Sequence, residues 1–166
     1  MHTAVLSWEK NKQRSSIQEK SSCYVLFRIA RQNYALPLTQ VIRVLRMAAV
    51  TTVPDMPDWL SGMINVAGQT LAVLDLRRLL GQPGKEPELQ DRLLIIQSSQ
   101  ITAAVSVDEV LSIQNVPDAQ IELPQQALSS SRLLSAIIRQ DESLIMVLDA
   151  QRLFLDRLEK LGDISL

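Results

Sequence analysis

Two aspartates, Asp75 and Asp149, are the residues whose type and position could carry chemistry. Each follows a short apolar run and precedes leucines at helical spacing. An aspartate at a strand end can accept a phosphoryl group, but a receiver-like site also needs a parallel sheet, further acids and a lysine at a later strand end. After Gly81 the only lysines are Lys85 and Lys160, neither at an expected strand end. The pattern favours a helix N-cap at both aspartates, with a phosphoacceptor at Asp75 as the alternative.

The remaining reactive side chains form no catalytic pattern. The single histidine, His2, lies in a polar N-terminal stretch and cannot be held as a base or metal ligand. The single cysteine, Cys23, opens an apolar run, where burial is the expected role rather than nucleophilic attack. The acidic pairs 108–109 and 141–142 fall in expected turns, where charge is ordinarily solvated. We therefore expect no enzyme activity, no cofactor and no metal.

Length, composition and net charge limit the class of protein and the kinds of partner that it could bind. The chain has 166 residues, 46% of them hydrophobic, and a net charge of −1, which suits one compact domain with a mainly aliphatic core. The chain has no excess of basic residues, so its charge gives no indication that it binds nucleic acid or an anionic membrane surface. No apolar run approaches the roughly 20 residues that cross a bilayer. We expect a cytoplasmic protein with no nucleic-acid partner and no direct membrane insertion.

The stretch from Trp59 to Gly81 organises the elements that hold these residues. It contains two short apolar runs joined by a turn over Asn65–Gln69, as in a β-hairpin. Gly62 and Gly68 are expected where the chain bends or another backbone approaches closely. These glycines, together with Asn65, Asp75 and Asp149, are interpreted as structural residues.

The same device occurs twice. Residues 146–154 match residues 72–80 position for position, sharing Val-Leu-Asp-x-x-Arg-Leu, and residues 35–38 with Val41 resemble residues 104–107 with Val110. The offsets are 74 and 69 residues, so a loop difference of 5 separates the two matches. Duplication is the economical explanation; chance recurrence of a common strand-and-capped-helix motif is the alternative.

About ten short strands with closely spaced turns indicate an all-β protein of two small barrels packed side by side, with short helices after each half and a C-terminal helix over 150–161. Residues 41–45 suit either a helix or a strand, and we choose a strand. The predicted organisation is a mobile tail over 1–22 and a domain over 23–162. Its halves span about 23–81 and 91–162, and 82–90 links them.

Several segments together resemble the CheW-like family from about Cys23 to about Leu161. The most specific are Gly-x-Ile-Asn-x-x-Gly at 62–68 and Val-x-Asp-Leu-Arg at 73–77; the others are Tyr34-Ala35-Leu36-Pro37, Val41 to Arg46, Val53-Pro54 and Pro57-Asp58-Trp59. The resemblance implies two five-stranded SH3-like barrels. It also implies a non-enzymatic adaptor for chemotaxis signalling, whose partners are the regulatory domain of a CheA-type histidine kinase and the cytoplasmic helix hairpin of a chemoreceptor.

Two positions depart from the family pattern. Ala67 stands where the family usually has Arg, and Arg43 stands where it tends to have Glu on a strand that resembles a partner-contacting one. Charge at an interface rim governs partner choice, so a divergent stand-alone module for another pathway, such as type IV pilus control, is the alternative function. The candidate partner-contact residues are Arg43, Val44, Leu45 and Trp59; for the apolar three, core packing is the alternative role.

Overall fold

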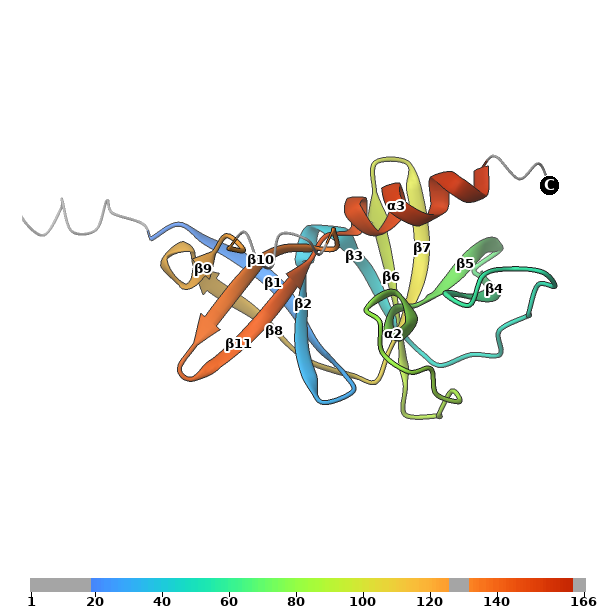
Figure 1. Cartoon of the computed structure of the whole chain (residues 1–166), viewed down its shortest axis with the longest axis horizontal. Coiled ribbons are helices and arrows are strands. Elements are labelled where there is room, and N and C mark those ends of the chain that lie inside the picture. Colours follow the sequence, from blue (N-terminus) through green and yellow to red (C-terminus); the bar gives the residue numbers. More distant parts are fainter. Residues whose placement is uncertain (1–18, 126–131, 163–166) are drawn as a thin grey trace, which may run out of the picture.

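The computed structural model describes residues 19–125 and 132–162. They form a mostly β structure of two sheets with few helices (Figure 1), which confirms the predicted class. The six-stranded sheet has the order β8-β1-β2-β11-β10-β9 and the five-stranded sheet the order β3-β6-β7-β5-β4. The strands are β1 (Ser21–Ile29), β2 (Gln32–Pro37), β3 (Val41–Arg46), β4 (Leu60–Val66), β5 (Gln69–Asp75), β6 (Arg92–Ser98), β7 (Ile101–Val107), β8 (Glu109–Pro117), β9 (Ile121–Glu122), β10 (Leu134–Gln140) and β11 (Ser143–Leu148).

The two sheets are not the two sequence halves. The hairpin β1–β2 is completed by β8 to β11, whereas β3, β4 and β5 join β6 and β7. The crossing happens at the turn η1 (Leu38–Gln40), after which β3 pairs with β6, and again after β7, where β8 pairs with β1. The alternation of apolar residues specifies a strand and its buried face, but not which neighbour completes its hydrogen bonds.

The strand register repeats with the sequence. Ala35 pairs with Val147 in parallel, and Ala104 pairs with Val73 in the same manner; the offsets of 69 and 74 residues convert one pair into the other. β3 carries a bulge against β6 just after Val41, and β8 carries the equivalent bulge against β1. Equivalent residues thus make equivalent pairings, which supports duplication over chance recurrence of a common motif.

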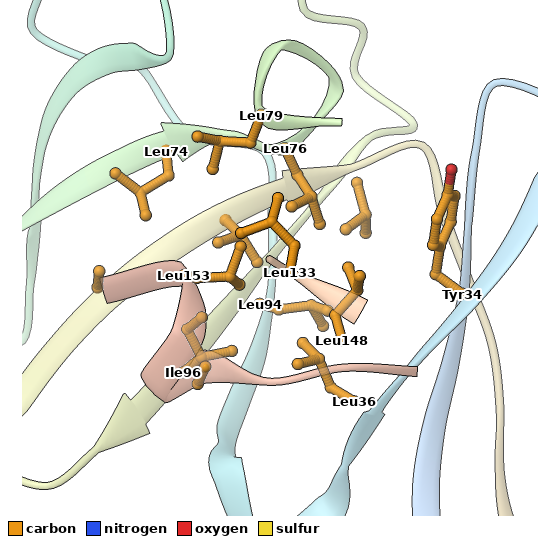
Figure 2. Packing of buried hydrophobic residues seen from close by; sticks show 14 of the residues in the cluster. Tyr34, Leu36, Leu74, Leu76, Leu79, Leu94, Ile96, Leu133, Leu148 and Leu153 are labelled. Atoms are coloured by element: carbon orange, nitrogen blue, oxygen red, sulfur yellow. The ribbon is translucent and has the colours of Figure 1, made fainter. Parts of the chain in front are cut away.

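The core has three parts. One cluster lies wholly within the six-stranded sheet and another wholly within the five-stranded sheet. The third and largest joins the two sheets: β2 supplies Leu36, β6 supplies Leu94 and Ile96, and helix α3 (Ala150–Gly162) supplies Leu153 (Figure 2). Because this shared core draws on both sheets and on α3, the two units fold against one another as one body.

Each of the two α-helices in the described part of the chain follows closely after a strand, α2 after β5 and α3 after β11. Helix α2 (Leu76–Leu79) buries two leucines in the shared core, and Gly81, with φ of +74°, follows it. Helix α3 buries Ala150, Leu153 and Phe154 in the same core. Among the described residues, no helix is long and apolar enough to cross a membrane.

Candidate interaction surface

Strand β3 forms one edge of the five-stranded sheet and pairs only with β6. Its outer side therefore carries backbone groups without a sheet partner. Arg43 and Val44 are exposed there, with 44% of the Val44 surface accessible. Ile42, which sequence reasoning passed over, is 52% exposed. A short β-branched edge strand with exposed apolar and cationic side chains has the features of a docking element.

The other two candidates lie deeper. Leu45 is half-buried and packs on the cluster of the five-stranded sheet. Trp59 is half-buried against the shared core, and the guanidinium carbon of Arg157 lies 5.9 Å from its ring centroid. That geometry suits a cation–π contact between the start of β4 and helix α3. The structure thus brings Arg43 and Val44 together at an exposed edge and gives Leu45 and Trp59 packing roles.

The glycine and asparagine residues hold the β4–β5 hairpin. The side-chain oxygen of Asn65 accepts a 3.0 Å hydrogen bond from the backbone N–H of Gly68. Ala67 and Gly68 have φ of +51° and +86°, the paired positive values of a type I′ turn. Gly62 has φ of +145°, and a Cβ there would collide with the carbonyl oxygen of Thr51. The collision arises because residue 51 pairs with Met63 beside β4.

The two aspartates that open the sequence argument begin helices. The Asp75 carboxylate accepts from the Arg78 backbone N–H at 3.3 Å. Asp149 accepts from two backbone N–H groups of α3, those of Gln151 at 2.8 Å and Arg152 at 3.3 Å. Both carboxylates therefore act as N-caps.

A cavity of about 410 Å³ lies beside Asp75, between residues 47–52 and 85–91. Lys85, Asp91 and Asp108 line it too, a grouping that the sequence did not predict. These side chains and Arg77 form ion pairs with one another. Lys85 Nζ lies 2.7 Å from Asp91, and Arg77 donates hydrogen bonds to both oxygens of Asp108, at 3.2 and 2.5 Å. Within the described residues no cluster of three or more His, Cys, Asp or Glu side chains could hold a metal ion.

This ion cluster joins the two sheets. Asp108, expected to be solvated, has only 20% of its side chain exposed and accepts a 2.8 Å hydrogen bond from the Ala30 backbone N–H. Burial opposes charge on Lys85, but its hydrogen bond to Asp91 and the neighbouring carboxylate charges outweigh burial and raise its pKa. The ion pairs of Lys85 therefore contribute stability at neutral pH, and on the alkaline side this contribution is lost as pH rises through that raised pKa. The cluster is a structural junction.

Two residues are more exposed than the sequence indicated. Cys23, expected to be buried, is half-buried at the start of β1. Ile113 on β8, 63% exposed, was not singled out. The repeat could have found it, because the offset of 69 residues relates it to Val44. His2 and most of the expected tail lie outside the described residues.

A shallow hollow of about 290 Å³ lies next to the β3 edge. Arg43 on β3 and Ala67 in the β4–β5 turn both line it. These are the two positions that were interpreted from the sequence as departures from the pattern of the resembled family. The sequence separates them by 24 positions, so nothing in it indicated that they share one surface.

The two-sheet β fold and the exposed edge of β3 suit a protein that works through protein–protein contacts. A family model, the CheW-like domain, matches residues 23–157. The chain therefore belongs to the CheW-like domain family.

Relatives agree. The chain is 28% identical over 128 residues to the chemotaxis protein CheW of Bacillus subtilis (strain 168), covering 76% of this chain and 82% of that one. It is 30% identical over 105 residues to Protein PilI of Pseudomonas aeruginosa, covering 63% and 58%. The crystal structure of the scaffolding protein TtCheW from Thermoanaerobacter tengcongensis superposes with a TM-score of 0.73 at 23% identity, covering 78% and 89%. That likeness concerns the fold.

Proposed function

We propose that this protein is a cytoplasmic adaptor that couples chemoreceptors to a CheA-type histidine kinase through protein–protein contacts. The observation that carries the proposal is an exposed edge strand, β3, in a chain of the CheW-like family. Arg43 and Val44 contact the partner in this proposal, while the shared core and the ion cluster keep the edge in place. We also propose that each of the two sheets forms an SH3-like barrel.

A second candidate is an adaptor for a different signalling pathway. Two of its relatives carry names other than CheW: Protein PilI of Pseudomonas aeruginosa and Protein FrzA of Myxococcus xanthus, each 30% identical over the matched region. Arg43 and Ala67 favour a changed partner, since charge at a contact selects among similar proteins. The two candidates share the scaffold role and differ in which kinase and receptor are bound.

Calorimetric titration tests the proposal. The folded protein is titrated with the regulatory domain of the CheA-type kinase encoded nearest to it, and separately with the receptor's cytoplasmic helix hairpin. We expect a Kd around the micromolar range for the kinase domain. Val44→Asp should weaken binding about tenfold or more by placing a charge in the contact, while the matched change Ile113→Asp on β8 should not. Absence of binding by the folded wild type to both probes would refute the coupling role.

A further inference from the structure

The hollow between β3 and the β4–β5 turn has a buried apolar floor and a polar rim. Leu71 and Ile95, each only 4% exposed, form part of its floor. Gln69 and Gln97 also line it and offer uncharged amide groups. The hollow opens beside exposed Ile42, so an entering side chain would meet a polar rim and an aliphatic neighbour together.

Among the described residues, Arg43 is the only ionisable side chain that lines the hollow. It is exposed, and within the described residues it makes no hydrogen bond or ion pair. In the part of the chain that the structure describes, no carboxylate lines the hollow, whereas in the ion cluster Asp108 pairs with Arg77 and Asp91 with Lys85. A planar guanidinium without an internal partner is suited to a carboxylate supplied by another molecule.

Ala67 in the β4–β5 turn also lines the hollow, and its single methyl group occupies little of that space. One arginine flanked by neutral amides matches the single negative charge of a carboxylate better than a phosphate dianion, which typically recruits several cations. The β3 edge beside the hollow can receive an extended segment.

We propose that this hollow is the specificity pocket of the adaptor: it receives a Glu or Asp side chain of the kinase regulatory domain, with an aliphatic side chain of the same segment packed on Ile42. The inference rests on the proposed function and adds the chemistry of the contact. Arg43 then supplies the cation, and the short side chain of Ala67 leaves space for the partner's acid.

The test is calorimetry with the same kinase regulatory domain at low and high salt. Arg43→Glu should weaken binding about tenfold or more and remove most of its salt dependence, and Arg43→Gln should weaken it less. Arg46→Glu is the matched control, because Arg46 is exposed on the same strand but does not line the hollow. It should change Kd by no more than about threefold, through long-range charge alone.

A second pair of variants changes Ala67, which lines the hollow from the β4–β5 turn. Ala67→Glu places an internal carboxylate where the partner's acid would bind and should weaken binding like Arg43→Glu, whereas Ala67→Gln, of the same size, should weaken it far less. Circular dichroism and thermal melting verify that each variant is folded. If wild type binds but Arg43→Glu matches Arg46→Glu, or Ala67→Glu matches Ala67→Gln, the pocket is refuted and the adaptor role stands. If the folded wild type does not bind the kinase domain, the pocket proposal falls with it.

Discussion

The first and second repeats of this chain have the same framework and different edges. Their bulges, parallel pairings and capped helices fall at equivalent positions. Their edge strands differ: β3 exposes Val44 on a strand that also carries Arg43 and Arg46, whereas β8 exposes Ile113 between the uncharged Ser112 and Gln114. Register was retained because a one-residue slip would turn a buried face to solvent. The exposed side chains of the two edge strands could diverge because they do not pack in the core.

The repeats also differ where a neighbouring segment approaches. Gly62 and Ala136 occupy equivalent bulge positions on β4 and β10. A neighbouring segment pairs with the next residue in both copies: Thr51 bonds to Met63 through two backbone hydrogen bonds of 2.8 and 2.9 Å, and Glu122 pairs with Ile137. Of the two bulge positions only Gly62 has a positive φ, of +145°, at which a Cβ would collide with the Thr51 carbonyl. This backbone conformation, rather than the bulge, explains why glycine is found in one copy and alanine in the other.

The largest predicted effect tests this explanation. Gly62→Ala should lower the free energy of unfolding by about 3 kcal/mol or more, because the new Cβ would collide with the Thr51 carbonyl and lie 2.8 Å from Val50 Cγ1 at a φ of +145°. Urea unfolding followed by circular dichroism measures it. Ala136→Gly is the matched change and should cost no more than about 1 kcal/mol. Equal losses in the two variants would show that the bulge alone sets the residue.

A second comparison concerns the two crossovers between sheets. After β7, the Asp108 carboxylate binds Arg77 and the Ala30 backbone N–H. After β2, the neutral Gln40 side chain accepts a 2.8 Å hydrogen bond from the Ala150 backbone N–H. Both contacts join a crossover to the helix that follows a repeat, one with charge and one without it.

Asp108→Asn should therefore destabilise the protein by about 1–3 kcal/mol, because it leaves a mostly buried Arg77 without its carboxylate. Gln40→Ala, which removes a neutral hydrogen bond, should cost about 1 kcal/mol. Thermal denaturation of both variants checks the order. A larger loss for Gln40→Ala would mean that the charged junction is replaceable by solvent.

The sequence predicted local structure well, because local structure depends on residues close in the chain. Runs rich in apolar and β-forming residues over 23–30 and 92–97 indicated strands, and the Asn65–Gly68 turn and the Asp75 and Asp149 caps follow from short-range hydrogen-bonding chemistry. β9 was missed because two paired residues, Ile121 and Glu122, leave no periodic pattern to detect.

Arrangements made across the fold were beyond the sequence. Nothing near residues 38–40 indicates that β3 leaves its own hairpin, so each predicted half mixes strands of both sheets. Asp108 looks like a turn acid until the crossover brings Arg77 to it. The exposure of Val44 and the partial burial of Leu45 depend on the bulge after Val41, which shifts the alternation by one residue.

The smallest predicted effect separates the two helix caps. Asp149→Ala should cost about 1–2 kcal/mol, because its carboxylate accepts two backbone hydrogen bonds and begins the 13-residue helix α3, whose first turns pack in the shared core. Asp75→Ala should cost less, about 0.5–1 kcal/mol, because it accepts one 3.3 Å bond at a four-residue helix. Asp75→Asn and Asp149→Asn keep a capping oxygen and should recover part of each loss. If urea unfolding showed Asp75→Ala to be the costlier change, Asp75 would contribute to the adjoining cavity as well as to its helix.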